Sequence, residues 1–436
     1  MKYLFLTLYI LLFIACSTKD TLVKKHVEID DLVRIPQNVD SFTAKLDVSK
    51  KTYTIQQEYN KHYFSVWNID EPSYSLEDIK WPFSSFKAGN SYGENLKLIE
   101  KEFFIRMQEE ANFDSYATIN RKAITIKDVN IRAFPTIKPL FRNPSRAGEG
   151  FPFDYLQNSS LMANKPIFIS HYSKDRAWVY IFSSFASGWI KSDAMVYLKS
   201  EDTQTWQKQQ QIFFIKENIP LYTEDGDFLF YSKIGMRLAL ESEDDESFTV
   251  LAVSTYKKTE AIFKKIKISK EIARKNILNL ERDSLAIVMK ELIKTKYGWG
   301  GMYGQRDCSS TLRDLYAPFN IWLPRNSSKQ AKIGRVINLE NLSDKEKIAT
   351  IKEKAIPFQT LLYKRGHIML FVGTFNEKIV IFHNTWGIKT MKDDIEGRVI
   401  IGKTIFSTLR VGKNLENYDI KSQLLKNIKS MNILTQ

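Results

Sequence analysis

The chain has 436 residues, of which 43% are hydrophobic and 13% aromatic, so it can build packed cores and is not a disordered protein. At roughly 150 residues per domain, this length predicts about three domains. The formal net charge of +14 favours an anionic neighbour, such as a membrane surface or an acidic wall polymer. The lysines form no dense run or nucleic-acid-binding module, so nucleic acid is not expected as a partner.

Residues 1–16 have the features of a bacterial secretory signal. Lys2 precedes a mostly apolar stretch that is too short to span a bilayer but fits a signal-peptide core. The stretch ends in Phe13-Ile-Ala-Cys16, which resembles a lipobox whose cysteine is acylated. The sequence therefore predicts a periplasmic protein anchored to the lipid bilayer through Cys16, and Ser17 favours the outer membrane. An ordinary cleaved signal with a chance cysteine is the alternative.

The next two segments carry no recognisable chemistry. Residues 17–50 are polar and are expected to form a tether. Residues 51–128 are expected to form a mixed α/β domain, with a strand at Tyr63–Trp67 and a helix over Asn95–Glu110.

Two small β-barrels and an α+β unit are expected in the rest of the chain. Short β-like runs divided by Pro, Gly and Asn predict the barrels at 129–200 and 201–257, because closing a sheet removes its exposed edges. In residues 258–436 helical periodicity comes first and β-like runs follow, which indicates a catalytic unit of α+β type. The fold class expected for the whole chain is therefore α+β.

Cys308 begins a helix-like stretch directly after the glycine-rich segment Tyr297–Gly304. The chain has two cysteines, so Cys308 is the thiol that remains if Cys16 is acylated. Asp307 or its neighbour could cap the helix, whose positive end would stabilise a thiolate and whose N–H groups could bind an oxyanion. A buried, inert cysteine is the alternative.

His367 and His383 lie on consecutive β-like runs. If these runs form a hairpin symmetric about Phe375, the two rings lie directly opposite each other, with Cβ atoms about 4.5–5.5 Å apart. One imidazole could then accept the proton of Cys308 while the other orients it. A zinc centre is the competing use of these residues, but short metal-ligand spacings are absent from the sequence, so no metal or other cofactor is expected.

Several motifs resemble the NlpC-type cysteine peptidases of bacterial cell walls. They are Tyr297-x-Trp-Gly-Gly, Asp307-Cys-Ser309, Leu323-Pro-Arg-x-Ser327-x-x-Gln330, Gly366-His367 and the later His383. The segment from Arg146 through Trp189 is similar to the first SH3-like domain that precedes some of these enzymes, and 51–128 looks like their clip domain. Ser310 stands where the family usually has Gly.

The resemblance implies a papain-like fold and hydrolysis of the γ-D-glutamyl-diaminopimelate amide bond in peptidoglycan stem peptides. Cys308 would attack the carbonyl, with His367 as base and His383 as its orienter. Tyr297 would help to line the oxyanion site. An amidase or acyltransferase with the same triad is an alternative, and so is a murein-binding scaffold.

The resemblance also implies a pocket for the free amine of an N-terminal L-Ala. Its expected residues are Asp307, Ser309 and Ser327, with Asp154, Tyr155 and Trp189 as candidates from the first barrel. A carboxylate in such a pocket would bind the ammonium group at short range and reject an acylated terminus.

Overall fold

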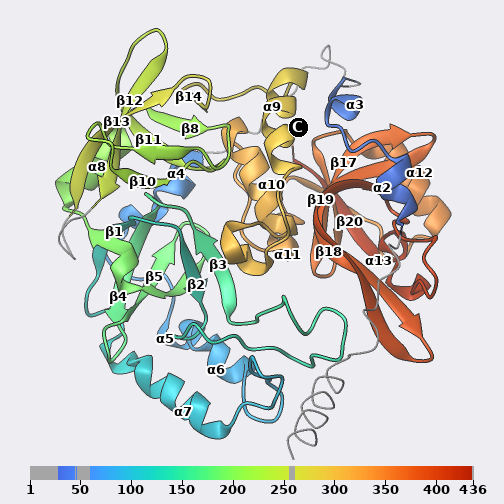
Figure 1. The fold of residues 1–436 in the computed structure, drawn as a ribbon, viewed down its shortest axis with the longest axis horizontal. Coiled ribbons are helices and arrows are strands. Elements are labelled where there is room, and N and C mark those ends of the chain that lie inside the picture. The colour runs from blue at the N-terminus through green and yellow to red at the C-terminus, as the bar shows by residue number, and fades with distance from the viewer. Residues whose placement is uncertain (1–27, 45, 47–58, 255–260, 435–436) are drawn as a thin grey trace, which may run out of the picture.

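The computed structural model describes residues 28–44, 46, 59–254 and 261–434 (Figure 1). The expected lipidation site, Cys16, lies outside these residues. No helix in the described part of the chain is both long enough and apolar enough to cross a bilayer. In Figure 1 the two barrels occupy the left side and the C-terminal unit the right side, with helices between them.

The first described residues pack against the C-terminal unit. They form two short helices, α2 (Asp30–Arg34) and α3 (Asp40–Thr43). The apolar residues of this segment join the core of the C-terminal unit: Ile35, Val39 and Phe42. The Phe42 ring stacks on Phe406 with ring centroids 4.5 Å apart. The expected tether over 17–50 is therefore wrong for residues 28–44, because a buried apolar stripe fixes this otherwise polar segment.

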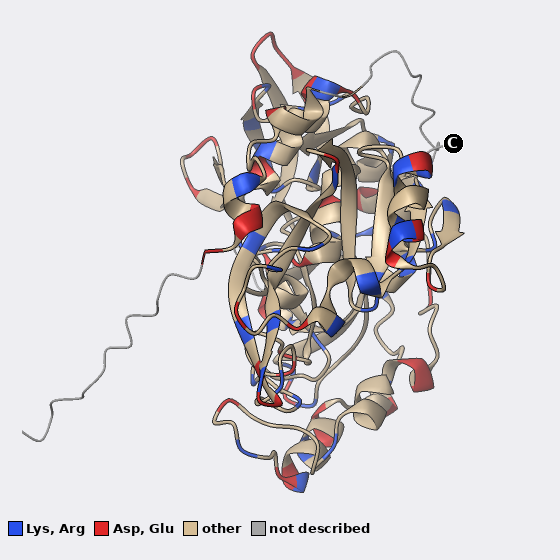
Figure 2. Ribbon diagram, turned by 90° about the vertical axis from the view of Figure 1, so that its right-hand side faces the viewer, with Lys and Arg blue, Asp and Glu red and all other residues tan. Residues whose placement is uncertain are grey.

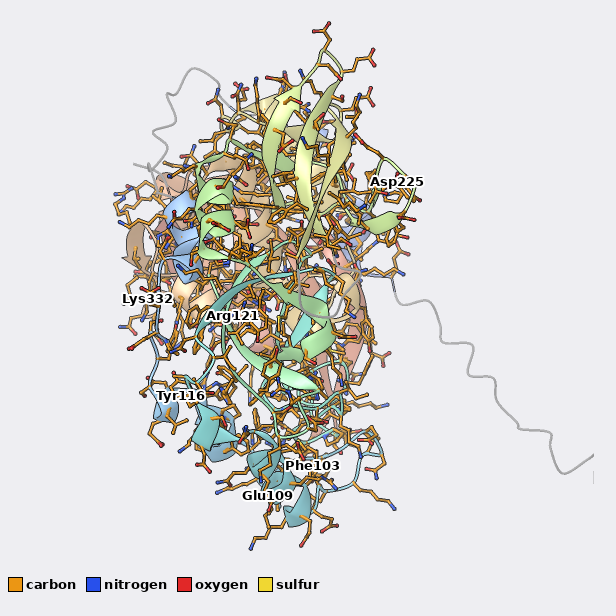
Figure 3. The ribbon with its side chains drawn as sticks, turned by 90° about the vertical axis from the view of Figure 1, so that its left-hand side faces the viewer. Phe103, Glu109, Tyr116, Arg121, Asp225 and Lys332 are labelled. Atoms are coloured by element: carbon orange, nitrogen blue, oxygen red, sulfur yellow. The ribbon has the colours of Figure 1, made fainter. Side chains whose placement is uncertain are left out.

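The segment that follows is helical. Its elements are α4 (Tyr59–Tyr63), η1 (Ser65–Trp67), α5 (Leu76–Ile79), α6 (Trp81–Ser85), α7 (Lys101–Glu110) and η2 (Phe113–Ser115). The strand expected at Tyr63–Trp67 is wrong: its aromatic residues are buried through helical turns, and Trp67 Nε1 donates to the carbonyl of Ala123 at 2.9 Å. The helix expected from Asn95 begins later, at Lys101. Figure 3 shows Phe103 and Glu109 of this helix at the end of the molecule opposite Asp225.

The first barrel is a seven-stranded sheet in the order β3-β2-β6-β5-β4-β1-β7. The strands are β1 (Arg121–Thr125), β2 (Val129–Arg132), β3 (Gln157–Leu161), β4 (Pro166–Tyr172), β5 (Trp178–Ser183), β6 (Ser187–Lys191) and β7 (Met195–Tyr197), with η3 (Ser192–Ala194) before the last. Strand β1 precedes the boundary expected at residue 129. It belongs to this sheet because it pairs with both β4 and β7.

The second barrel follows α8 (Ser200–Lys208). Its strands are β8 (Gln211–Phe214), β9 (Pro220–Tyr222), β10 (Phe228–Tyr231), β11 (Arg237–Glu243), β12 (Ser247–Ser254), β13 (Ile262–Ser269) and β14 (Ala273–Arg274). They form a five-stranded sheet in the order β13-β12-β11-β8-β14 and a β9–β10 ribbon. The barrel therefore extends beyond the boundary expected at residue 257, because β13 pairs with β12 along its full length.

The C-terminal unit places helices against a six-stranded antiparallel sheet in the order β15-β20-β16-β17-β18-β19. The strands are β15 (Arg335–Asn338), β16 (Thr360–Lys364), β17 (His367–Phe375), β18 (Lys378–Lys392), β19 (Ile395–Thr408) and β20 (Ile428–Ile433). The helices are α9 (Arg282–Leu292), η4 (Trp299–Gly304), α10 (Cys308–Tyr316), η5 (Ala317–Phe319), α11 (Ser327–Gln330), α12 (Asp344–Lys354), η6 (Ile420–Ser422) and α13 (Leu424–Asn427). Helices α9 and α10 face the barrels, whereas α12 and α13 lie at the far side (Figure 1).

Alternate residues of the central strand β17 enter two different cores. Ile368 and Leu370 join the core that contains α9 and α10, whereas Met369 and Phe371 join the core that contains Ile351 of α12. This alternation is the pattern of a strand buried on both faces. It holds the start of β17, and with it His367, in a fixed position beside α10.

Charged residues of both signs lie side by side over the surface. On the side of the molecule drawn in Figure 2, Lys and Arg segments alternate with Asp and Glu segments. Helix α12 shows this mixture within one element, with acidic residues in its first turn and basic residues in its last. Such an order complements the helix dipole and stabilises the helix.

Candidate active site

Cys308 is the first residue of α10, and its neighbours close a capping box around it. The Asp307 carboxylate accepts from the backbone N–H of Ser310 at 2.9 Å, and the Ser310 hydroxyl accepts from the N–H of Asp307 at 2.9 Å. Ser310, which replaces the glycine usual in the resembling family, therefore has a structural use here. The helix start, and the N–H groups beside the sulfur, are firmly fixed.

His367 and His383 lie on adjacent antiparallel strands, β17 and β18, but not directly opposite each other. The hairpin symmetric about Phe375 is wrong, because Phe375 pairs with Lys378 and the turn falls at residues 376–377. A β-bulge between Phe371 and Gly373 then shifts the register by one residue. The resulting register offset is even, so both rings stay on the same face as diagonal neighbours. Their centroids are 5.1 Å apart, and His367 Nε2 lies 2.8 Å from His383 Nδ1.

A serine fixes the tautomers of both rings. The Ser407 hydroxyl donates to the carbonyl of Thr408 at 3.1 Å, so it accepts from His383 Nε2, which lies 2.9 Å away. The other nitrogen of His383, Nδ1, is then an acceptor for the N–H of His367 Nε2. This leaves the lone pair of His367 on Nδ1. Ser407 was not found by sequence reasoning, since a serine near the end of β19 gives no signal before the sheet register is known.

The three side chains of the candidate triad are enclosed, and burial disfavours the charged form of each. Burial raises the pKa of the Cys308 thiol to about 12, and the nearby Asp307 carboxylate adds to the rise. Burial lowers the pKa of His383 to about 3. Burial, with His383 and Lys364 close by, lowers the pKa of His367 well below its usual value. Burial therefore opposes the resting thiolate that the helix end would favour, because dehydration destabilises the anion.

The sulfur of Cys308 is close to groups from two other segments. The backbone N–H of Ile368, the residue after His367, and that of Ser309 both favour its ionised form. Tyr297 also lies near it, since burial, Cys308 and Asp307 raise the pKa of the tyrosine well above its usual value. The Tyr297 hydroxyl thus keeps its proton and can donate a hydrogen bond.

Arg325 organises the polar side of the site. It forms an ion pair with Asp307 at 2.6 Å, and both side chains are about nine-tenths buried. Its guanidinium also donates to the hydroxyl of Ser309 at 2.9 Å and to that of Ser159, in the first barrel, at 2.8 Å. Burial alone would raise the pKa of Asp307, but Arg325 and the hydrogen bonds hold it below its usual value. The sequence motif contained Arg325 without showing this role.

The first barrel also packs closely against the glycine-rich segment that precedes Cys308. Gly300 has φ +58°, and a Cβ there would lie 2.5 Å from the carbonyl oxygen of Gln157. At Gly301, with φ +85°, a Cβ would lie 2.0 Å from the hydroxyl of Ser160. The two glycines therefore permit strand β3 to dock directly on the segment that leads to Cys308.

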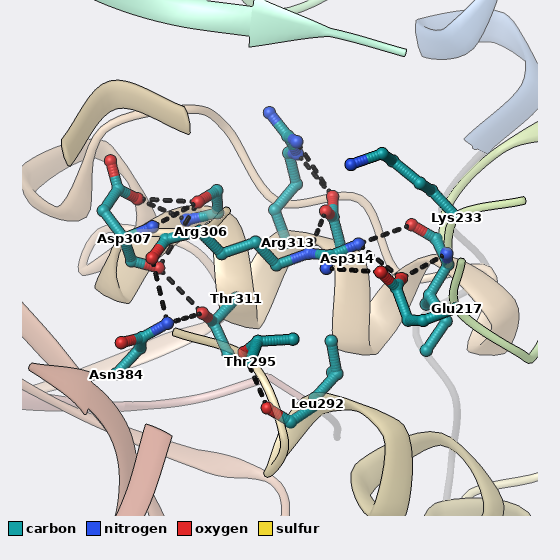
Figure 4. A network of polar contacts seen from close by, with 12 residues as sticks. Glu217, Lys233, Leu292, Thr295, Arg306, Asp307, Thr311, Arg313, Asp314 and Asn384 are labelled. Carbon is teal, nitrogen blue, oxygen red and sulfur yellow. Dashed lines mark hydrogen bonds and ion pairs between the residues drawn. The ribbon is translucent and has the colours of Figure 1, made fainter. Parts of the chain in front are cut away.

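The second barrel anchors Arg306, the residue that precedes Asp307. Arg306 pairs with Glu217, in the loop between β8 and β9, at 2.7 Å and with Asp314 of α10 at 2.7 Å. Asn384 of β18 donates to the carbonyl of Arg306 at 2.9 Å. Figure 4 shows these contacts as one network. Both barrels thus position the start of α10.

Two residues expected in the amine pocket lie elsewhere. Asp154 is 2% exposed, and its carboxylate pairs with Arg132 at 2.6 Å. Trp189 is 1% exposed and packs in the barrel core against His171 and Tyr180. Their assignment to the pocket wall is wrong, because each side chain is used inside the first barrel.

The other four expected residues are Asp307, Ser309, Ser327 and Tyr155. Asp307 and Ser309 flank Cys308 and are 3.2 Å apart through their side-chain oxygens. Ser327 begins α11 and is half-buried. Tyr155 is half-buried, with its ring centroid 6.0 Å from that of Trp299.

A cavity of about 490 Å³ opens beside the histidines. His367 and His383 line it, with Tyr297, Trp299 and Trp386 as aromatic walls. Four basic residues also line it: Lys364, Arg365, Lys389 and Arg398. None of its described lining residues is Asp or Glu. Elsewhere too, no group of three or more His, Cys, Asp or Glu side chains that could hold a metal is found among the residues described.

These features place the Cys308 thiol and two hydrogen-bonded histidines in one α+β unit. The family models that match are an NLPC_P60 N-terminal stabilising domain (residues 5–116), an SH3 domain of SH3b1 type (139–191), an SH3 domain of SH3b2 type (201–245) and the NlpC/P60 family (294–394). The chain therefore carries an NlpC/P60 domain behind a stabilising domain and two SH3b domains. The expected family resemblance and fold class are confirmed.

The chain is similar to known structures to different degrees. One, described as a novel NlpC/P60 endopeptidase from Photobacterium damselae subsp. piscicida, superposes with a TM-score of 0.79 at 21% identity, covering 92% of this chain and 97% of that one. An NlpC/P60 family protein from Bacillus cereus ATCC 10987 matches with a TM-score of 0.48 at 15% identity, covering 72% of this chain and 100% of that one. No curated protein matches the sequence significantly.

Proposed function

We propose that this protein is a cysteine endopeptidase that hydrolyses the γ-D-glutamyl-diaminopimelate amide bond of peptidoglycan stem peptides. The observation that carries the proposal is the hydrogen-bond chain from Ser407 through His383 to His367, whose neighbour Ile368 contacts the Cys308 thiol through its backbone N–H. It supplies a base with a defined lone pair, a group that orients the base, and a thiol at a helix start.

The reaction starts from a neutral pair, which consists of the Cys308 thiol and the unprotonated His367 imidazole. His367 Nδ1 takes the thiol proton while the sulfur of Cys308 bonds to the γ-carbonyl carbon. Backbone N–H groups at the helix start and the Tyr297 hydroxyl stabilise the oxyanion. The imidazolium then gives its proton to the amine of diaminopimelate as the C–N bond breaks. Water attacks the thioester, His367 takes its proton, and the thiol is restored as the S–C bond breaks.

The charge of the cavity supports an anionic substrate. Stem peptides carry free carboxylates on D-glutamate and diaminopimelate, and the four basic residues of the cavity complement them. A free N-terminal L-Ala is a further part of the proposal. Asp307 and Ser309 would receive its amine, although Arg325 already balances the charge of Asp307.

Digestion of L-Ala-γ-D-Glu-meso-diaminopimelate followed by mass spectrometry tests this proposal. The expected products are L-Ala-D-Glu and diaminopimelate. Adding an amine acceptor distinguishes hydrolysis from acyl transfer, because a transferase would yield a new amide. Intact peptide after incubation would refute the assigned bond. Equal rates for free and N-acetylated L-Ala would remove the amine requirement alone.

The pH profile of kcat/KM follows from the neutral pair. His367 must be unprotonated, and its lowered pKa keeps it so well below pH 6.5. The thiol, with its pKa raised to about 12, stays protonated through the alkaline range. We expect kcat/KM to be flat from about pH 6.5 to 9 and to fall only at more acidic pH. A half-maximum at or above pH 6.5 would contradict the neutral pair.

We also propose that Cys16 anchors the protein to the bilayer facing the periplasm, on the basis of its lipobox-like context. The mature protein extracted from membranes should then begin at an acylated Cys16. Intact-mass measurement checks this, and an unmodified mature N-terminus would exclude the anchor.

A further inference from the structure

The cavity beside the histidines receives the leaving group, if the proposed function holds. His367 must deliver its proton to the departing amine, and a proton donor has to lie within hydrogen-bond distance of that nitrogen. Because His367 lines the cavity, the residue that carries the amine extends into it. The residues that line the cavity therefore determine which diamino acid the enzyme accepts.

Two enclosed N–H donors in this cavity have no hydrogen-bond partner within the described chain. They are Nη1 of Arg398 and Nε1 of Trp386. Buried donors are almost always satisfied in proteins, so two of them in one functional cavity need an explanation. Both donate, and neither can accept, so the matching chemistry is an acceptor such as a carboxylate.

The basic residues of the cavity differ in how far they are neutralised. Lys389 pairs with Glu396 at 2.6 Å and lies 3.7 Å from Asp419. Arg398, its cross-strand neighbour, forms no ion pair with any residue that the structure describes. Lys364 pairs in register with His367, and burial lowers its pKa. The positive charge available to a ligand therefore comes from Arg398, Arg365 and Lys364 more than from Lys389.

A β-bulge sets the position of Trp386. The pairing of β18 with β19 shifts between Thr385 and Gly387, at the position of Trp386. Gly402, in the facing segment, has φ +66°, the left-handed conformation common at such bulges. The centroid of the indole ring lies 5.9 Å from that of the Tyr297 ring, so Trp386 stands beside this tyrosine at the bulge. Bulges next to active sites commonly redirect a side chain in this way.

We propose that Arg398 and Trp386 bind the carboxylates of the diamino acid on the leaving-group side. The enzyme would then select diaminopimelate, whose side chain ends in a centre carrying a carboxylate, over lysine, whose side chain ends in an amine alone. A planar guanidinium suits this task, since it binds carboxylates through paired N–H donors.

The test measures binding to the full-length C308A protein by calorimetry, so that no cleavage occurs. The ligands are L-Ala-γ-D-Glu-meso-diaminopimelate and L-Ala-γ-D-Glu-L-Lys. We expect at least tenfold tighter binding of the diaminopimelate peptide. C308A/R398Q should bind both peptides equally, with the lysine peptide unaffected. C308A/W386F, which keeps an aromatic ring but lacks the N–H donor, should lose part of the preference.

The control is C308A/K392Q, because Lys392 is exposed on the same hairpin and does not line the cavity. It should keep the full preference, which separates specific binding from a general loss of charge. Equal binding of both peptides by C308A, or equal weakening of both by R398Q, would overturn the subsite. Equal cleavage of both peptides by the unmodified enzyme would do so too, while leaving the proposed function intact. Selective binding without cleavage would support the subsite and refute the proposed function.

Discussion

The C308A variant is expected to lose cleavage of L-Ala-γ-D-Glu-diaminopimelate by about 10⁴-fold or more while it stays folded. Removing a covalent nucleophile usually costs this much, because the remaining groups can only orient water. Cys308 is 8% exposed, so losing its sulfur should lower the free energy of unfolding by only about 1 kcal/mol. Peptide digestion and thermal unfolding measure the two effects.

Thiol labelling gives an independent check of the same residue. The chain has two cysteines, so a C16S background reports on Cys308 alone. Because burial raises the pKa of this thiol to about 12, labelling of the free enzyme near pH 7 should be slow. Turnover retained in C308A would refute the assignment of the nucleophile. Rapid labelling at neutral pH would instead contradict the neutral resting state.

The position of Cys308 at a helix start could be predicted from sequence because it depends on local signals. An acidic N-cap followed by Cys308 after a glycine-rich segment predicts a helix start, and the helix begins there. The two histidines were placed on one hairpin for the same reason. Their exact register is not predictable in this way, because nothing in the sequence reveals that the turn falls at residues 376–377 or that a bulge follows Phe371.

What sequence reasoning missed depends on contacts between distant segments. Arg325 reaches Ser159 across 166 positions of the chain, and Ser407 meets His383 from another strand. The N-terminal residues resemble a tether in sequence because they contain few apolar side chains. That these side chains are buried becomes visible only in the fold, where Phe42 stacks on Phe406. The location of Asp154 could not be predicted for the same reason, since Arg132 binds its carboxylate inside the barrel.

The R325M variant is expected to lower the free energy of unfolding by about 3–5 kcal/mol and kcat by tenfold or more. Removing one partner of a buried ion pair leaves the other charge uncompensated, and the Asp307 carboxylate is 7% exposed. The lost guanidinium also releases Ser309 and the contact to the first barrel at Ser159. Chemical denaturation and peptide digestion measure both losses, and K352M is the control. Lys352 pairs with the exposed Glu377 at 2.9 Å, so its removal should cost under about 1 kcal/mol.

The double variant D307N/R325M separates charge from packing in this prediction. Asparagine keeps the shape and the helix-capping ability of Asp307 but carries no charge that needs Arg325. If the uncompensated carboxylate causes the instability, the double variant should regain most of the free energy lost in R325M. It should not regain kcat, because Ser309 and the first barrel still lack the guanidinium. A double variant as unstable as R325M would show that Arg325 acts by packing the two domains together. Recovery of both stability and kcat would show that the barrel contact has no part in positioning the nucleophile.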